Sequence, residues 1–296
     1  MYELIQVSEH CYYIACPAKI GVVKTGADTV CLIDSGSDKD AAKKVKKHLD
    51  ANGWKLDAIY NTHSNADHIG GNLCLREQTG CRIYAPGVEC AMTRHPILEP
   101  AYLYGGFPPK ALKNKFLMAQ ASPAEYLTPD VLPEGFEIIP LGGHFFDMVG
   151  FKTPDGVAFI ADCLSSELTL QKYGVGVIVD VEAYIKTLER IKTMEAKLFI
   201  PSHAEPTEDI APLAQINIDA VLRTSEQILS LCAEPVTFDE LIGRLFDSMG
   251  LSLSLQQYVL VGSTVKSYLA WLCDKGQMTV TAENNRLMWQ NKSSYA

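Results

Sequence analysis

The segment NTHSNADHIGGN, residues 61–72, places two His, one Asp and one Asn within the six positions from His63 to His68. Imidazole nitrogens and carboxylate oxygens bind zinc and iron in proteins, so His63, Asp67 and His68 are candidate metal ligands. Between them, where a third imidazole would help, stands Asn65. Its amide oxygen is either a weak ligand or a hydrogen-bonding group for a neighbouring ligand or substrate. The sequence leaves both roles open.

Three more polar residues follow apolar, strand-like runs: His144 after FEIIPLGG, Asp162 after GVAFIA and His203 after KLFIPS. Each would project from the carboxyl end of its strand, so a folded sheet can bring all three to the loop that carries the first motif. A lone His is more often structural than a ligand. Here four of the seven His and two Asp recur at the same structural position, which predicts a single metal centre.

The chemistry expected of such a centre is hydrolysis. A bound metal lowers the pKa of its water to about 7, which yields a hydroxide nucleophile, and it polarises the carbonyl or phosphoryl oxygen under attack. Asp67 is the residue we expect to be catalytic, because it would both bind metal and orient that water.

These residues need a framework of strands and helices. The runs YELIQV, CYYIAC, IGVVKT and TVCLID in the first sixty residues predict short strands, and residues 39–49 predict a helix that buries Ala42, Val45 and Leu49. LDAIY predicts a buried strand that ends at the first motif, and a short helix follows as far as Gly80. Strands and helices then alternate to about residue 230, a pattern typical of an α/β protein whose active site lies in strand-to-helix loops.

Residues 86–134 interrupt this alternation. They hold eight of the fifteen prolines together with Tyr102, Tyr104 and Phe107, so regular strands are not expected there. Two interpretations stay open for this insertion. It is a lid or substrate wall, in which those three aromatic residues bind substrate, or it is a structural cover that packs on the core.

Residues 233–296 form a different unit. Thr237 and Glu240 have the spacing of a capping box, a second helical stretch follows, and MTVTAENNRLMWQ predicts a β-hairpin that turns at Asn284 and Asn285. Helices closed by a hairpin suggest a winged helix. Five basic and six acidic residues give this part a net charge of −1, which suits packing, dimerisation or the shaping of a pocket better than nucleic-acid binding.

THSNADHIGG, followed at increasing distances by His144, Asp162 and His203, resembles the metallo-β-lactamase superfamily, whose signature is HxHxDH with a distant His, Asp and His. The turn at Asp34, Ser35 and Gly36 is similar to the family's early structural Asp. The resemblance covers residues 1–230 and implies an αββα sandwich with the metals at one edge of the sheets. Residues 233–296 resemble the winged-helix-like appendage of a lactamase-like endoribonuclease subgroup.

Position by position, the resemblance implies one metal site from His63, Asn65 and His144 and another from Asp67, His68 and His203, with Asp162 bridging them. Because Asn65 is a neutral donor, it implies unequal loading, with one or two zinc ions per chain. Iron or manganese would also suit these ligands. The bond cleaved is left open among ester, thioester, lactone, lactam and phosphodiester.

Two other functions remain open: a non-haem iron oxidoreductase acting on a persulfide, dioxygen or nitric oxide, and a metal-bearing binding protein without catalysis. The chain has 296 residues, 47% of them hydrophobic, and a formal charge of −9, which favours a small-molecule substrate over nucleic acid. No apolar run approaches the ~20 residues that span a bilayer, and the N-terminus lacks the pattern of a signal peptide. We therefore expect a cytoplasmic protein without a membrane partner.

Overall fold

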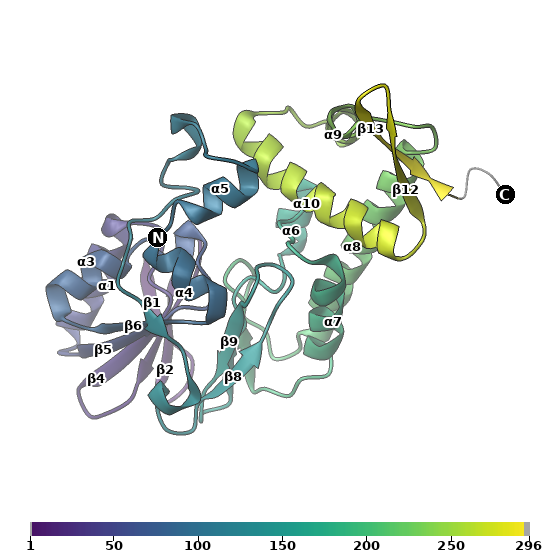
Figure 1. Cartoon of the computed structure of the whole chain (residues 1–296). Coiled ribbons are helices and arrows are strands. Elements are labelled where there is room, and N and C mark those ends of the chain that lie inside the picture. The colour runs from purple at the N-terminus through teal and green to yellow at the C-terminus, as the bar shows by residue number, and fades with distance from the viewer. Residues whose placement is uncertain (1, 293–296) are drawn as a thin grey trace.

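The computed structural model describes residues 2–292 (Figure 1). Its first half contains a seven-stranded sheet in which the strands stand in the order of the sequence, from β1 to β7. The strands are β1 (Glu3–Gln6), β2 (Cys11–Ala15), β3 (Ile20–Lys24), β4 (Thr29–Ile33), β5 (Lys55–Tyr60), β6 (Arg82–Ala85) and β7 (Glu125–Tyr126). β1 to β4 pair antiparallel, whereas β4 to β7 pair parallel. The carboxyl ends of β4 and β5 therefore lie at the same edge.

A second sheet has four strands in the order β11-β10-β9-β8. They are β8 (Glu137–Pro140), β9 (Val149–Lys152), β10 (Val157–Phe159) and β11 (Leu198–Ile200). β9 is antiparallel to both β8 and β10, and β10 is parallel to β11. Hence β8, β10 and β11 run in one direction, and the residues that follow them emerge at one edge.

Apolar side chains form three layers around these sheets. One cluster fills the space between the two sheets, where Cys31 and Tyr60 of the first meet Phe151 and Phe159 of the second. A second cluster lies between the first sheet and the helices α1 (Lys39–Ala51) and α3 (Asn72–Thr79). A third joins the second sheet to α7 (Val181–Ile191) and α8 (Ala211–Leu231). The fold is thus the expected αββα sandwich.

Helix α1 shows why the sequence pattern was informative. Asp38 caps its N-terminus by accepting hydrogen bonds from the backbone N–H groups of Asp40 and Ala41. Its buried face includes Ala42, Val45 and Leu49, as their helical spacing predicts.

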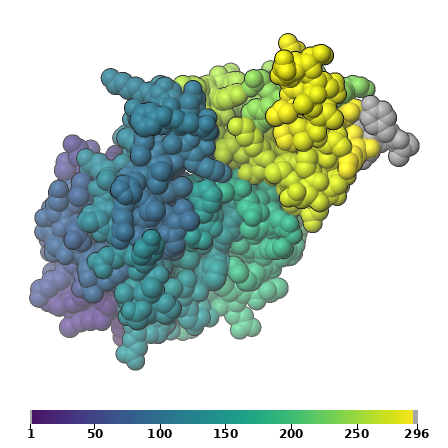
Figure 2. Space-filling view, in the orientation of Figure 1, coloured from purple at the N-terminus to yellow at the C-terminus, as the bar shows by residue number. Residues whose placement is uncertain are grey.

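Most of the regular secondary structure in the insertion at residues 86–134 is helical. The insertion contains α4 (Gly87–Arg94), α5 (Leu98–Tyr104), the 3₁₀ turns η1 (Lys110–Leu112) and η2 (Pro129–Val131), and the two-residue strand β7. Within this described segment the one strand is the two-residue β7, so longer regular strands are absent, as its prolines predict. α4 packs on β6 and α5 packs on α10, so the insertion lies against the C-terminal helices (Figure 2).

The C-terminal part contains α9 (Phe238–Ser248), α10 (Leu255–Asp274) and a hairpin of β12 (Met278–Glu283) and β13 (Arg286–Asn291). The capping box of Thr237 and Glu240 is present. Asn284 and Asn285 have φ values of 50° and 62°, the left-handed conformation that a two-residue hairpin turn requires. These elements match the expected helices and hairpin. Their classification as a winged helix stays a prediction, and residues 293–296 of this part lie outside the described residues.

The apolar cluster around α7 and α8 continues without a break into α9 and α10, through Leu241, Val265, Tyr268 and Leu269. Ser267 on α10 also donates a hydrogen bond to the carbonyl of Val179. Residues 233–292 therefore pack on the sandwich, and the division into domains 1–230 and 233–296 stays a prediction. In the described part of the chain, no helix combines the length and apolar character needed to cross a membrane.

Candidate metal centre

The first motif lies where the fold predicts it. Residues 61–65 form the loop after β5, and the short helix α2 (Ala66–Ile69) carries Asp67 and His68. His144, Asp162 and His203 follow β8, β10 and β11, whose carboxyl ends share one edge. All six side chains meet at this edge, in two groups. In each group the potential ligand atoms lie within 4.8 Å of one another: His63, His144 and Asp162 in the first, and Asp67, His68 and His203 in the second.

The second group has the spacing of atoms that share a metal ion. The Nε2 atom of His203 lies 3.4 Å from Oδ2 of Asp67, and Nε2 of His68 lies 3.8 Å from the same oxygen. Asp162 approaches both rings, at 3.1 Å from His203 and 3.2 Å from His68. Ligands bound at about 2.1 Å in a tetrahedron are separated by ~3.4 Å, so the residues present fit a zinc-sized ion.

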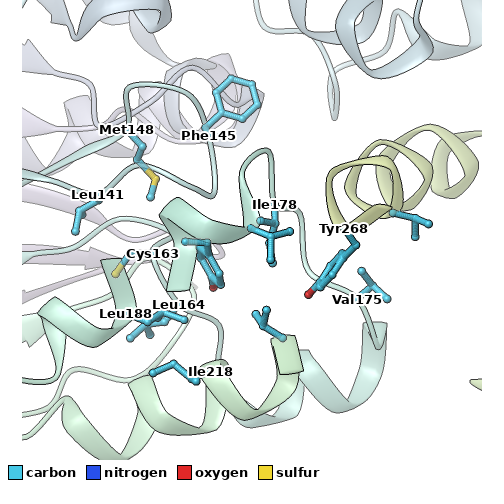
Figure 3. Close-up of a cluster of buried hydrophobic side chains, with 14 of the residues drawn as sticks. Leu141, Phe145, Met148, Cys163, Leu164, Val175, Ile178, Leu188, Ile218 and Tyr268 are labelled. Carbon is cyan, nitrogen blue, oxygen red and sulfur yellow. The ribbon is translucent and has the colours of Figure 1, made fainter. Parts of the chain in front are cut away.

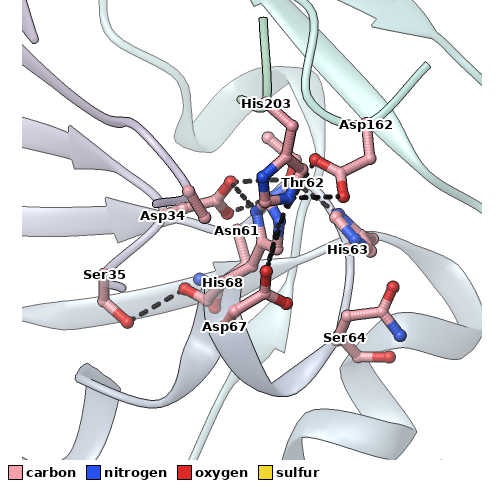
Figure 4. Close-up of polar contacts among 12 residues, drawn as sticks. Asp34, Ser35, Asn61, Thr62, His63, Ser64, Asp67, His68, Asp162 and His203 are labelled. Carbon is pink, nitrogen blue, oxygen red and sulfur yellow. Dashed lines mark hydrogen bonds and ion pairs between the residues drawn. The ribbon is translucent and has the colours of Figure 1, made fainter. Parts of the chain in front are cut away.

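One carboxylate orients both imidazoles of the first motif (Figure 4). Asp34, at the turn after β4, accepts a hydrogen bond of 2.7 Å from Nδ1 of His68. It also accepts from the hydroxyl of Thr62, which in turn lies 2.9 Å from Nδ1 of His63 and accepts from it. With protons fixed on Nδ1, the Nε2 atoms of both rings keep the lone pair that a metal needs.

The other two imidazoles are oriented by backbone carbonyls. Nδ1 of His144 donates to the carbonyl of Val177 over 2.8 Å, and Nδ1 of His203 donates to the carbonyl of Pro17 over the same distance. A carbonyl can only accept, so these rings also carry the proton on Nδ1. All four imidazoles therefore present unprotonated Nε2 atoms to one small space when the rings are neutral.

Asn65 is held between a carboxyl group and an imidazole. Its Nδ2 donates to Oε1 of Glu99 over 2.7 Å, which turns its Oδ1 toward Nε2 of His144 at 3.1 Å. Since that Nε2 carries no proton in the neutral ring, two acceptor atoms face each other. This arrangement suits two ligands of a common cation, and the geometry favours the weak-ligand role for Asn65.

Three buried atoms in this space lack a hydrogen-bond partner: Nε2 of His63, Nε2 of His68 and Oδ1 of Asp162. The contact of 3.2 Å between the last two does not have hydrogen-bond geometry. Buried polar atoms are rarely left unpaired, because each costs about 1–3 kcal/mol. Cations bound at the two groups would satisfy all three atoms.

The electrostatics of the two groups differ. Asp162 raises the pKa of His203 to about 10. Burial lowers the pKa of His68, but Asp162 and the neighbouring carboxylates outweigh it and hold that pKa well above its usual range. Burial instead holds the pKa of His63 well below its usual range and also lowers the pKa of His144. The carboxylates thus favour positive charge on His68 and His203, whereas burial disfavours it on His63 and His144. Unequal loading of the two groups stays a prediction.

Two supporting residues were missed in the sequence, Glu89 on α4 and Glu99 on α5. Glu89 is fully buried and accepts hydrogen bonds from both the hydroxyl and the backbone N–H of Ser64. Burial raises the pKa of Glu89 to about 7 and that of Glu99 well above its usual range. The available signal was a single Glu inside each of the apolar runs GVECAM and ILEPAYL. The insertion therefore fixes the loop of the first motif, a role that neither interpretation of it included.

The aromatic residues proposed to bind substrate lie on or just after α5. Tyr102 packs edge-on against Phe146, at 5.1 Å between ring centroids, while Tyr104 and Phe107 are exposed, Phe107 to 79%. None of the three lines the cavity of about 460 Å³ that adjoins His144, Asp162 and His203 within the described structure. Substrate binding by these three residues stays a prediction.

Comparison with known proteins adds independent information. A family model described as the metallo-beta-lactamase superfamily matches residues 13–203. The hydroxyacylglutathione hydrolase of Methylococcus capsulatus is 40% identical over 63 residues, 19% of this chain and 25% of that enzyme. The enzyme of the same name from Ruegeria pomeroyi is 28% identical over 131 residues, 43% of this chain and 41% of that enzyme. The chain thus matches about a quarter to two fifths of the length of these relatives.

Solved structures resemble nearly the whole chain. A beta-lactamase domain protein from Burkholderia ambifaria has a TM-score of 0.72 at 17% identity, covering 98% of this chain and 93% of its own. A metallo-beta-lactamase family protein from Thermus thermophilus also has a TM-score of 0.72, at 18% identity, covering 99% of this chain and 98% of its own. At such identities the likeness shows the fold alone.

Proposed function

The chain belongs to the metallo-beta-lactamase superfamily, and on that premise we propose that it is a metal-dependent hydrolase of a thioester or a related acyl ester. The observation that carries the proposal is the convergence of four Nε2 atoms and two carboxylates at one sheet edge, with every imidazole held through Nδ1. Thioester hydrolysis is favoured because the relatives with matching segments are named hydroxyacylglutathione hydrolases.

Asp67, His68 and His203 would hold the more tightly bound ion, with Asp162 shared between the two groups. His63, His144 and Asn65 would hold a second, weaker one. Zinc suits this set of nitrogen and carboxylate donors, and iron or manganese would also be accepted. When bound, such an ion supplies an activated water nucleophile and polarises the acyl oxygen.

The residues of the chain would supply orientation and proton handling. The side chain of Asp67 is 42% exposed, so its carboxylate can reach a water molecule that approaches from solvent. The neighbouring His68 is fully buried. Its hydrogen bond to the Asp34 carboxylate prevents rotation of the imidazole ring. Asp67 would therefore orient the attacking water and accept a hydrogen bond from it, while the rigid imidazoles keep the geometry.

The proposal is tested by a panel of thioesters, esters, lactones and phosphodiesters offered to the purified protein and to Asp67→Ala. We expect thioester turnover that disappears on chelation, returns with added zinc, and is lost in Asp67→Ala. Elemental analysis of protein from its native host identifies the metal. Activity that both proteins retain equally after chelation would refute the proposal.

A further inference from the structure

A cavity of about 460 Å³ adjoins the candidate metal centre. His144, Asp162 and His203 form part of its wall. The cavity extends from them along α6 (Glu167–Tyr173), α8, α9 and α10. This volume falls in the range of ~300–1,000 Å³ that holds small-molecule ligands. The C-terminal helices therefore shape the space next to the reacting groups.

The cavity is lined mainly by apolar side chains. Four of its lining residues, Leu164, Val175, Ile178 and Tyr268, are labelled in the buried hydrophobic cluster of Figure 3. The apolar lining side chains come from the loop after β10, from residues 174–178 and from the C-terminal helices, and include Leu164, Val175, Ile178, Val221, Phe246 and Leu260. In the described structure its lining contains no Lys or Arg. A phosphate or carboxylate group would find no cationic side chain on this wall to pair with, other than the imidazoles of the metal centre.

Polar groups on the α8 wall are already engaged by the protein. Asn217 accepts from the backbone N–H of Ser165 and donates to the carbonyls of Ser165 and Leu213. The hydroxyl of Thr224 donates to the carbonyl of Ala220. A ligand lying along α8 would gain little from polar atoms there and much from apolar ones.

Several large apolar side chains that neighbour the lining residues in sequence are exposed. Helix α6 buries none of its residues, and Leu168 on it is 77% exposed. Tyr173 at its end is half-exposed and lines the cavity, and the exposed Leu253 and Leu255 flank another lining residue, Ser254. Exposed large apolar side chains close to a cavity are typical of a binding site for an apolar ligand.

We infer that this cavity binds the hydrocarbon chain of an acyl thioester and thereby selects medium-length apolar acyl groups. The inference rests on the proposed function for the bond that is cleaved. When the hydrocarbon chain of the ligand lies along α8 and α10, its thioester carbonyl lies at His144, Asp162 and His203. Hydrolysis then forms a carbon–oxygen bond to water, breaks the carbon–sulfur bond, and transfers a proton from water to the departing thiolate, with no oxidant or reductant.

The test uses the zinc-loaded full chain and the acetyl, hexanoyl and decanoyl thioesters of N-acetylcysteamine. Each buried methylene contributes roughly a fourfold gain in binding. We therefore expect kcat/KM to rise on the order of a hundredfold from acetyl to hexanoyl. A kcat/KM that is flat or falls along the series would overturn the inference.

Two variants narrow the cavity at lining residues of different helices: Ala220→Phe on α8 and Leu260→Phe on α10. Either should reduce the ratio of hexanoyl to acetyl kcat/KM at least about tenfold, because the added ring occupies the volume of several methylenes. Leu222→Phe is the matched control, since Leu222 is exposed on α8 and does not line the cavity. Thermal unfolding shows whether each cavity variant folds. If one of them does not fold, the other variant alone tests the inference. An unchanged ratio in a folded cavity variant contradicts the inference.

Binding is measured separately from catalysis, with amide analogues in which nitrogen replaces the thioester sulfur. Calorimetry should show that the hexanoyl amide binds more tightly than the acetyl amide, and that Ala220→Phe removes the difference. If no thioester is hydrolysed but this length dependence is found, the proposed reaction fails and the cavity assignment stands. If thioesters are hydrolysed without any length dependence in binding, the assignment fails and the proposed reaction stands.

Discussion

Replacing Asp34 by Asn tests how one carboxylate prepares both metal groups. Oδ1 of Asp34 accepts from the backbone N–H of Thr62 over 2.8 Å, and Oδ2 accepts from the Thr62 hydroxyl and from Nδ1 of His68. A backbone N–H can only donate, so the oxygen of the substituted amide must stay opposite it. The NH₂ group then faces His68, whose Nδ1 must become an acceptor while the proton moves to Nε2. His68 thereby loses the lone pair that binds metal.

The size of the effect follows from this change of tautomer. Loss of a partner that orients a metal ligand typically lowers affinity 10–100-fold, or about 1.4–2.8 kcal/mol. Asp34 also orients His63 through the hydroxyl of Thr62, so we expect the upper end of that range. Asn differs little from Asp in shape and tolerates the left-handed conformation of this residue, where φ is 63°. The substitution should therefore leave the backbone in place.

Zinc affinity is measured by competition with a chromophoric chelator, and folding by thermal unfolding of the chelated protein. Asp155→Asn is the matched control. Asp155 lies in the turn between β9 and β10, at the end of β10 opposite Asp162. It accepts hydrogen bonds from the hydroxyl of Ser8 and the backbone N–H of His10. It should retain wild-type affinity. If Asp34→Asn folds and binds zinc as tightly as Asp155→Asn, the orienting role assigned to Asp34 is wrong.

Asp67→Ala should lose at least ~10²-fold in turnover with its fold retained, the scale of a lost positioning or acid–base group, whereas His48→Ala should match the wild type in the same kinetic assay. Asn65→His should raise the zinc content per chain toward two equivalents in elemental analysis, since an imidazole binds zinc better than an amide does; unchanged stoichiometry and affinity would place Asn65 outside the ligand set. Burial raises the pKa of Glu89 from 4.5 to about 7, so between these values the folded chain binds a proton that the unfolded chain has released. The free energy of unfolding should therefore fall as pH rises through this window. Urea unfolding should show a weaker pH dependence for Glu89→Gln than for the wild type. The same pH dependence in both proteins would contradict the raised pKa of Glu89.

Much of the secondary structure could be predicted because local chemistry determines it. Short apolar runs predicted β1 to β5 and the strands β8, β10 and β11, whereas β6 and β7 were not predicted. The buried face of α1 followed from the spacing of Ala42, Val45 and Leu49. The left-handed pair Asn284 and Asn285 gave the hairpin turn, since few other residues accept that conformation. The helices of the insertion were not foreseen, because prolines exclude strands without specifying what replaces them.

The candidate site was predictable as a set of residue types but not as an arrangement. The order of polar residues after apolar runs identified His63, Asp67, His68, His144, Asp162 and His203, and the structure brings them together. What the order could not provide was the orientation of each ring. The partners Val177 and Pro17 act through backbone carbonyls, which carry no signature in the sequence.

The sequence by itself therefore determined which donor atoms are available and that they would gather at one edge, because strand direction fixes where each strand ends. Only the tertiary structure decided what surrounds them. Glu99 reaches Asn65 across 34 positions of the chain, and the C-terminal helices form a cavity wall far in sequence from the first motif. Such contacts depend on how elements pack, and packing is set by the fit of whole surfaces, which no local pattern of residues encodes.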